Sequence, residues 1–212
     1  MACGKAALIT AGGRGTRISQ LGMEKPLVEV LGKKLIDRAI DAASSPMVSQ
    51  VYVSTSTSTP RTEQYLKGKE VIVIRTSGRG YVEDLHEIMS SIQEDIVVII
   101  PVDMPLLTKK SVETVLREFL SAGKASLTVA LDPATIRSVG LDVTYTDVLD
   151  GRETTFCGVS VVERKEMLKD SYVEAAYMFT DSIDFAVNVN TPGDLSVAER
   201  ILKEREVTKV TF

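Results

Sequence analysis

Residues 5–17, KAALITAGGRGTR, decide the fold class of this chain. Residues 5–9 form an apolar run of the kind that makes a buried strand, and a glycine-rich turn follows it directly. The glycines of that turn allow positive φ and close backbone approach, so that consecutive N–H groups point at phosphate oxygens. They are Gly12, Gly13 and Gly15. Cations follow at Arg14, Arg17 and Lys25. The stretch therefore predicts a polyphosphate-binding loop at the end of a strand.

Two better-known phosphate-binding loops do not fit this sequence. A P-loop needs Gly-Lys followed by Ser or Thr, and no Gly-Lys pair in the chain meets that requirement. A dinucleotide fingerprint would need a third glycine at position 18, which is Ile18, and an acid at the end of the second strand, where Val53 leads into Ser54. A tight turn without a ligand would explain the glycines but not the cations.

The composition is that of an ordinary globular protein. The chain has 212 residues, of which 44% are hydrophobic and 25% charged, with no tryptophan. This suffices for one domain over residues 1–212 with a three-layer core. A net charge of −4 argues against nucleic acid and against an anionic membrane surface as partners. The longest apolar run, 96–100, is too short to cross a bilayer and no signal-peptide pattern is present, so we expect a cytoplasmic protein.

Cysteine and histidine are scarce. Cys3 and Cys157 are the two cysteines, which makes a disulfide framework or a cysteine zinc site untenable and fits a reducing compartment. His86 is the one histidine, so mechanisms with a histidine dyad or a multi-histidine metal site are excluded.

Short β-branched runs alternate with helical patterns over the first 130 residues, as in βαβ units. The predicted strands are 5–10, 51–54, 71–75, 96–102, 125–131, 156–162 and 185–190. The predicted helices include 35–43, an apolar stripe over 112–120, and 191–204, with Thr191 as N-cap and Pro192 at the first helical position. The expected fold is α/β, with three α/β/α layers around a mostly parallel mixed sheet of the Rossmann-like kind.

Residues 132–160 interrupt this rhythm with a loop-rich excursion. Such segments often carry substrate contacts. A surface insertion without a role explains the pattern equally well.

Two further strand ends carry oxygen-bearing side chains. Asp103 follows strand 96–102, at the edge where open α/β sheets bind ligands, and a carboxylate there is suited to Mg²⁺ beside nucleotide phosphates. Asn190 ends the predicted strand 185–190 and is a second candidate metal ligand. A turn or cap role remains open for both residues.

A second glycine-rich turn, TSGRGYVEDL at 76–85, follows strand 71–75 and opens a helix. Its backbone groups and the Ser77 hydroxyl are suited to the edge of a purine, and Glu83 or Asp84 to a ribose hydroxyl or a base amine. Helix capping by Ser77 is the alternative. The hydroxyl run at 54–59 is interpreted as a plain solvated loop.

Together these elements resemble the nucleotidyltransferases of the glycosyltransferase-A-like type. Within that superfamily, the loop at 10–17, the decapeptide 76–85 and the segment 188–191 are similar to the archaeal GTP:adenosylcobinamide-phosphate guanylyltransferases. The decapeptide is the most specific part. Departures from the wider pattern are Ile18-Ser19 after the loop arginine, and Asn190 in place of an aspartate, which puts metal binding by two carboxylates in doubt.

The resemblance implies GTP as donor, a corrinoid phosphate as acceptor, and pyrophosphate as the second product. The catalytic candidates are Arg17, Lys25 and Asp103. The nucleotide-binding candidates are Ala11, Gly12, Gly13, Arg14, Gly15, Thr16, Lys25, Thr76, Ser77, Gly78, Gly80, Glu83, Asp84 and Asp103. The acceptor-binding candidates, in an open groove at 132–160, are Arg137, Arg152 and Gly158. The metal candidates, for Mg²⁺, are Asp103 and Asn190.

Three points stay open from the sequence. A molybdopterin guanylyltransferase would carry much the same motifs, and a non-catalytic GTP-binding protein would use the same first loop. A homodimer is compatible with the sequence but not indicated by it.

Overall fold

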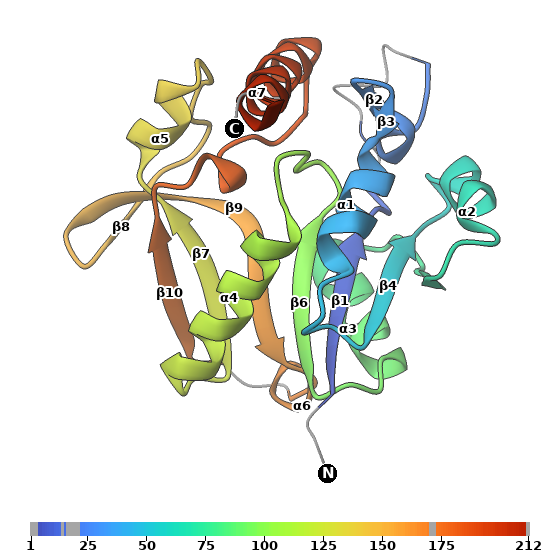
Figure 1. The fold of residues 1–212 in the computed structure, drawn as a ribbon. Coiled ribbons are helices and arrows are strands. Elements are labelled where there is room, and N and C mark those ends of the chain that lie inside the picture. Colours follow the sequence, from blue (N-terminus) through green and yellow to red (C-terminus); the bar gives the residue numbers. More distant parts are fainter. Residues whose placement is uncertain (1–3, 14, 16–21, 170–172, 211–212) are drawn as a thin grey trace.

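The structure is a computed structural model that describes residues 4–13, 15, 22–169 and 173–210. Its centre is a mixed sheet with the strand order β10-β7-β9-β6-β1-β4-β5, and β8 pairs with β9 beside it (Figure 1). The strands are β1 Lys5–Thr10, β4 Gln50–Thr55, β5 Ile72–Arg75, β6 Ile96–Pro101, β7 Ser126–Leu131, β8 Asp147–Leu149, β9 Arg152–Glu163 and β10 Ala175–Thr180. A separate small hairpin consists of β2 Glu29–Val30 and β3 Lys33–Lys34.

The sheet has a parallel half and a mixed half. β1 pairs in parallel with both β4 and β6, and β5 adds in parallel to β4. β9 runs antiparallel to β6 and β7 on its two sides, and β10 pairs in parallel with β7 at the outer edge. The central parallel strands β1 and β6 are nearly continuous apolar runs, because both of their faces are covered. The mostly parallel mixed sheet predicted from the sequence is thus confirmed.

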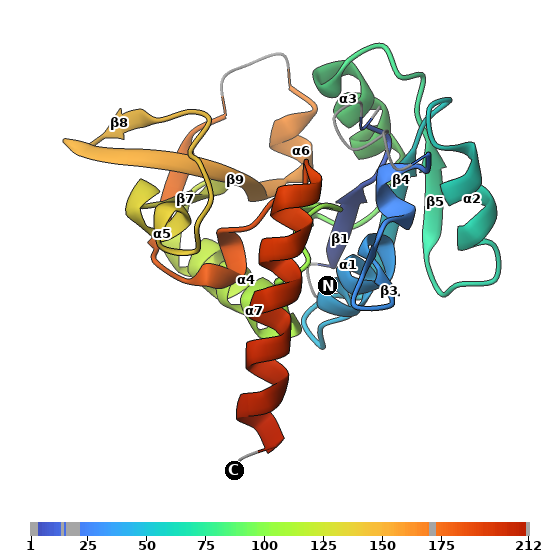
Figure 2. The ribbon, with the colours of Figure 1, turned by 90° about the horizontal axis from the view of Figure 1, so that it is seen from above.

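Helices cover the sheet from two sides, which gives the predicted α/β/α layers (Figure 2). They are α1 Leu35–Ala43, α2 Pro60–Leu66, α3 Tyr81–Ser91, α4 Lys109–Ala122, α5 Pro133–Ser138, α6 Arg164–Met167 and α7 Pro192–Val210, with 3-10 turns η2 Lys25–Leu27 and η3 Ile183–Phe185. The larger core packs the apolar faces of α1, α4 and α7 against one side of the sheet. A smaller core packs α3 and α6 against the other.

One predicted strand is wrong. Residues 185–190 form no strand: η3 ends at Phe185, and an extended loop follows. Val187 and Val189 are fully buried, so the apolar alternation that suggested a strand reflects packing into the core. The edge position belongs to β10, whose alternating burial matches a half-exposed strand.

The segment 132–160 contains α5, β8 and most of β9, and it lies at the end of the mixed half of the sheet. α7 begins at Pro192, as predicted, with Thr191 accepting a hydrogen bond from the backbone N–H of Asp194. Among the described residues, no helix combines the length and the apolar character that a membrane span requires.

Candidate active site

The predicted site residues that the structure describes come from segments far apart in the sequence and meet at the carboxyl-terminal edge of the parallel strands. In a parallel sheet the strand ends converge at one edge, and the loops that leave them shape a ligand crevice. Here β1, β4, β5 and β6 supply those loops, and the loop before α7 joins them from the far side of the sheet.

Lys25, Asp103 and Asn190 form the polar centre of this edge. The ammonium Nζ of Lys25 lies 2.5 Å from Oδ2 of Asp103 and 2.9 Å from the amide oxygen Oδ1 of Asn190. The side chains of Lys25 and Asp103 are only 13% and 15% exposed. Two oxygen atoms therefore converge on one cation in a partly desolvated position, where electrostatic interactions are stronger than in open water.

Lys25 owes its position to the segment just before it. Glu24 accepts hydrogen bonds from the backbone N–H groups of Arg61 and Thr62, each at 2.7 Å, which ties this segment to the first turn of α2. A carboxylate at a helix N-terminus satisfies otherwise unpaired N–H groups. Lys25 is the first residue of the short turn η2, and the next residue, Pro26, is buried, so the backbone at Lys25 is fixed from both sides.

Asn188, a residue that the sequence analysis did not single out, orients Asp103. Its amide nitrogen donates to Oδ1 of Asp103 at 3.1 Å and to the carbonyl oxygen of Cys157 at 3.4 Å. The backbone N–H of Val189 donates to the Asp103 carbonyl at 2.8 Å, which clamps the loop before α7 onto the end of β6. The sequence did contain a signal for Asn188. Apolar and polar residues alternate over 187–190, and Asn188 and Asn190 are the polar members.

Asp194 fixes Asn190 from the other side. Its carboxylate accepts hydrogen bonds from the backbone N–H groups of Asn190 and Thr191, both at 2.8 Å. Together with the Thr191 bond to the N–H of Asp194 this forms a reciprocal cap at the start of α7. Asn190 can therefore stabilise the turn before α7 and, at the same time, place its amide oxygen beside Lys25.

Cys157 lies at the centre of β9, and its carbonyl oxygen accepts from the Asn188 amide that also donates to Asp103. Burial raises the pKa of its thiol to about 12, because the charged thiolate would be desolvated there. The side chain is a packed apolar group rather than a nucleophile.

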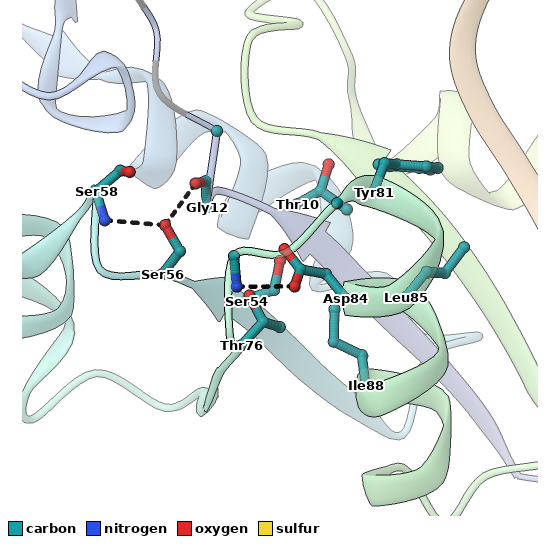
Figure 3. Close-up of a pocket in the computed structure, with 13 residues that line it drawn as sticks. Thr10, Gly12, Ser54, Ser56, Ser58, Thr76, Tyr81, Asp84, Leu85 and Ile88 are labelled. Carbon is teal, nitrogen blue, oxygen red and sulfur yellow. Dashed lines mark hydrogen bonds between the residues drawn. The ribbon is translucent and has the colours of Figure 1, made fainter.

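A cavity of about 230 Å³ opens between the first loop and the start of α3 (Figure 3). It is lined by the ends of three strands and by the inner face of α3, at Thr10, Gly12, Gly13, Ser54, Ser56, Ser58, Thr76, Gly78, Gly80, Tyr81, Asp84, Leu85 and Ile88. Apart from Asp84 on α3, its polar side chains belong to the strand ends and the loops that follow them, and its apolar side chains belong to α3. This combination is suited to a flat heterocycle with polar edges.

Asp84 and Glu87 hold the second glycine turn in place. Asp84 accepts a hydrogen bond from the backbone N–H of Gly78 at 2.9 Å, and Glu87 accepts from the backbone N–H and the hydroxyl of Ser77 at 3.0 and 2.8 Å. These bonds hold the pKa of the Glu87 carboxyl below its usual value. Gly78 has φ +70°, a backbone conformation that favours glycine. Ser77 and Glu83 do not line the cavity, and the Glu83 carboxylate lies against Gly80 instead.

The hydroxyl run 54–59 is not a solvated loop, contrary to the interpretation from sequence. Ser54, Ser56 and Thr59 are at most 5% exposed, and Ser56 donates from its hydroxyl to the Gly12 carbonyl at 2.7 Å. A Cβ at Gly12 would lie 3.3 Å from the Ser56 side chain. The run therefore packs against the first loop and forms one wall of the cavity.

Within the first loop, the described residues differ in what their N–H groups can bind. The N–H of Ala11 already donates to the Ser54 carbonyl at 3.0 Å. Gly12 and Gly13 line the cavity, and Gly15 has φ +55°. The predicted residues Arg14, Thr16 and Arg17 lie outside the described residues.

The three acceptor candidates each contact a different residue in the structure. Arg137 lies 3.9 Å from Glu153, and the Arg152 guanidinium stands over the Phe179 ring at 5.5 Å. Gly158 is exposed on β9 with φ +89°, and a Cβ there would lie 3.0 Å from Pro101. A second, larger cavity of about 680 Å³ adjoins the polar centre and is lined by Asn188 and Asn190, among others.

The donor set fits a divalent cation held partly by substrate. Among the described residues no three His, Cys, Asp or Glu side chains cluster as a complete ligand set. However, Asp103 and Asn190 direct a carboxylate oxygen and an amide oxygen at the one point now held by the Lys25 ammonium. Mg²⁺ takes such oxygen ligands from one or two side chains and completes its shell with phosphates and water.

A family model described as the MobA-like NTP transferase domain matches residues 7–141 of this chain. An adenosylcobinamide-phosphate guanylyltransferase from Methanocaldococcus jannaschii is 31% identical over 203 residues, covering 93% of this chain and 97% of its own. A molybdenum cofactor guanylyltransferase from Shewanella woodyi is 33% identical over 127 residues, covering 59% of this chain and 62% of its own.

Solved structures repeat the fold at low identity. CMP:2-keto-3-deoxy-manno-octonic acid synthetase in complex with CTP superposes with a TM-score of 0.71 at 16% identity, over 95% of this chain and 99% of its own. A 4-diphosphocytidyl-2C-methyl-D-erythritol synthase from Anaerococcus prevotii gives 0.67 at 12% identity, over 95% and 96%. These similarities establish the same fold over nearly the whole chain.

Proposed function

Since this chain belongs to the MobA-like NTP transferase family and is thus a nucleotidyltransferase, we propose that it transfers GMP from GTP to adenosylcobinamide phosphate. The products are adenosylcobinamide-GDP and pyrophosphate, a step in the assembly of the cobalamin nucleotide loop.

One observation carries the choice of acceptor. Similarity to the archaeal corrinoid enzyme runs through 93% of this chain and 97% of the relative, including the mixed half of the sheet. Similarity to the molybdenum cofactor enzyme from Shewanella woodyi covers 59% of this chain. The similarity over the mixed half of the sheet therefore supports a corrinoid acceptor.

We assign the guanine base to the cavity between the first loop and α3. Asp84 at its wall offers a carboxylate for the N–H donors of guanine, and Gly78, Gly80 and Thr76 line the same wall. The phosphates then lie along the first loop, where N–H groups of Gly12, Gly13 and Gly15 face the anion, assisted by Arg14, Thr16 and Arg17. Ser77 and Glu83 support this turn from outside the cavity.

The reaction needs no strong general base, because the acceptor phosphate is already an anion at neutral pH. One of its oxygens attacks the α-phosphorus of GTP in line, the bond from the α-phosphorus to the bridging oxygen breaks, and pyrophosphate leaves with that electron pair. Lys25, from its place beside Asp103 and Asn190, neutralises charge on the reacting phosphates, and Arg17 stabilises the departing pyrophosphate.

We further propose that Asp103 and Asn190 hold Mg²⁺ together with phosphate oxygens. The metal would supply charge neutralisation at the triphosphate. Asn188 keeps the Asp103 carboxylate in the orientation that leaves Oδ2 directed at this point.

The direct test is transfer itself. The protein is incubated with GTP, Mg²⁺ and adenosylcobinamide phosphate, and pyrophosphate release and the mass of the corrinoid product are followed. Adenosylcobinamide without the phosphate is the matched control and should give no pyrophosphate. Absence of a GDP-corrinoid with the phosphorylated acceptor would refute the proposed acceptor.

The family alternatives have distinct outcomes in the same assay. Pyrophosphate released with molybdopterin but not with the corrinoid phosphate would assign guanylyl transfer to molybdopterin. Binding of GTP without pyrophosphate from either acceptor would indicate a GTP-binding protein without transferase activity.

A further inference from the structure

The mixed half of the sheet has one face that no helix of the described residues covers. α4 packs against the other face of β7, β9 and β10. α3 lies over the parallel half of the sheet, and α6 lies beside the carboxyl-terminal end of β9 (Figures 1 and 2). On β10, Ala176 and Met178 pack into the core beneath α4. Tyr177 and Phe179 point to the opposite side and are each 40% exposed, which is unusual for large aromatic side chains on a sheet.

Three aromatic rings gather on this uncovered face. The strand register places Phe179 opposite Ala130 on β7, and Ala130 opposite Phe156 on β9. The rings of Phe156 and Tyr177 are 6.1 Å apart with an angle of 38° between their planes. The small residue on the middle strand, Ala130, lets rings from the two outer strands approach across it, and Ala130 itself is fully buried. We call Phe156, Tyr177 and Phe179 the aromatic face.

This face is continuous with the polar centre of the site. Phe156 lines the cavity of about 680 Å³ that Asn188 and Asn190 also line. Two residues along β9, Gly158 is exposed and lies against Pro101, at the end of the strand that leads to Asp103. The absence of a side chain at Gly158 leaves the surface between the aromatic face and Asp103 open.

The GTP site does not account for the aromatic face. The cavity that suits the base lies at the ends of β1, β4 and β5, between the first loop and α3. Its volume of about 230 Å³ holds a base but not a macrocycle. A corrinoid acceptor brings a broad, largely apolar ring system and an adenine group, and such surfaces pack on exposed aromatic rings in offset or tilted arrangements.

We propose that the aromatic face is the docking surface for the corrinoid part of the acceptor, which places the acceptor phosphate next to Lys25 and Asp103. This inference rests on the proposed function and extends it by assigning residues to acceptor binding. Arg152, held over Phe179 at 5.5 Å, borders the same surface and keeps a positive charge at its rim.

The test separates acceptor binding from chemistry. The variants are Tyr177→Ala and Phe179→Ala, and the matched control is Leu120→Ala, which removes a 50% exposed side chain from α4 on the opposite side of the sheet. Steady-state rates are measured against acceptor at saturating GTP, and against GTP at saturating acceptor. The expected result is an acceptor KM raised at least tenfold by each aromatic variant, with kcat and the GTP KM within about twofold. Leu120→Ala should change none of them, and Tyr177→Phe should restore the acceptor KM.

A binding measurement without turnover distinguishes failure of the docking surface from failure of the proposed function. Equilibrium dialysis of adenosylcobinamide phosphate, followed by corrinoid absorbance in the absence of GTP, should show weaker binding by Tyr177→Ala than by wild type. Wild-type transfer together with an unchanged acceptor KM in both aromatic variants would overturn the docking surface and leave the proposed function standing. Wild-type protein that neither binds nor modifies the corrinoid would overturn both.

The same face lies beside the outer edge of β10, where no strand of the described residues pairs and a second copy of the chain could add. Sedimentation of wild type and Tyr177→Ala tests whether a second copy of the chain binds to this face. Loss of a dimer in the variant with an unchanged acceptor KM would assign the face to self-association and refute acceptor docking.

Discussion

The ammonium of Lys25 lies 2.5 Å from Oδ2 of Asp103, although 78 residues separate them in sequence. Asn190 adds a second oxygen at 2.9 Å. The Lys25 ammonium therefore contacts both of the side chains that we propose as Mg²⁺ ligands. In the proposed mechanism, the phosphate oxygens of GTP would replace Asp103 and Asn190 as partners of Lys25 when the metal binds.

Replacing Lys25 should abolish most of the activity without unfolding the protein. Lys25→Ala removes the cation at the reacting phosphates, and the loss of one such contact typically lowers kcat by about 100- to 1000-fold. Lys25→Arg keeps the charge but changes its geometry, so it should recover only part of the rate. The measurement is kcat for pyrophosphate release, with circular dichroism as the control for folding. A Lys25→Ala enzyme with near-normal kcat would remove Lys25 from the mechanism.

Asn190 can be tested through the metal requirement. Asn190→Asp supplies a second carboxylate, which binds Mg²⁺ more strongly than an amide oxygen, so this variant should remain active and reach half its maximal rate at a lower Mg²⁺ concentration. Asn190→Leu keeps the backbone N–H bond to Asp194 but removes the oxygen, and should need more Mg²⁺ and lose at least tenfold in rate. Chelation by EDTA should abolish turnover in all forms. Identical Mg²⁺ curves for wild type and Asn190→Leu would exclude Asn190 as a ligand.

The sequence was sufficient for the parallel half of the fold and insufficient for the mixed half. The strand-to-glycine-turn pattern at 5–17 and the apolar run at 96–100 are local signals, and β1 and β6 follow from them. In contrast, the edge strand β10 was not predicted, and the loop 186–190 was predicted as part of a strand over 185–190. Burial of Val187 and Val189 comes from tertiary packing, which a single sequence does not distinguish from strand pairing.

The site residues likewise divide into those that local sequence signals indicate and those that depend on tertiary contacts. Lys25, Asp103 and Asn190 were selected because each follows a strand or a glycine turn, and the structure brings these three together. Asn188 donates to Asp103, 85 residues away, and Glu87 accepts from Ser77, 10 residues earlier. The alternation over 187–190 was a local signal for Asn188, whereas no local pattern marks Glu87. The aromatic face joins residues of β9 and β10 through β7, so it becomes visible only once the strand register is known.

Asp84 should control both affinity for GTP and selectivity for guanine. Asp84→Ala removes the carboxylate at the cavity wall and the acceptor for the Gly78 N–H, so the KM for GTP should rise by about tenfold or more. In the proposed complex the carboxylate accepts from guanine donors that adenine lacks, so the preference for GTP over ATP in kcat/KM should shrink in this variant. The matched control is Glu87→Gln, which keeps an acceptor for Ser77 outside the cavity and should stay within about twofold of wild type. Unchanged discrimination in Asp84→Ala would place guanine recognition elsewhere.

Cys157 should be inert in the folded protein and should couple stability to alkaline pH. Its thiol has a pKa raised by burial from 9.0 to about 12, so the thiolate population at pH 8 is about 1,000-fold lower than for an ordinary thiol. In a Cys3→Ser background, a disulfide reagent should modify Cys157 only slowly at pH 8, and rapidly once urea unfolds the chain. Since the unfolded thiol ionises near 9.0 and the folded thiol near 12, the contribution of this group to the free energy of unfolding falls as pH rises through that interval. Cys157→Ala should therefore show a shallower loss of stability above pH 9, and prompt labelling of the native Cys3→Ser protein at pH 8 would contradict the burial of the thiol.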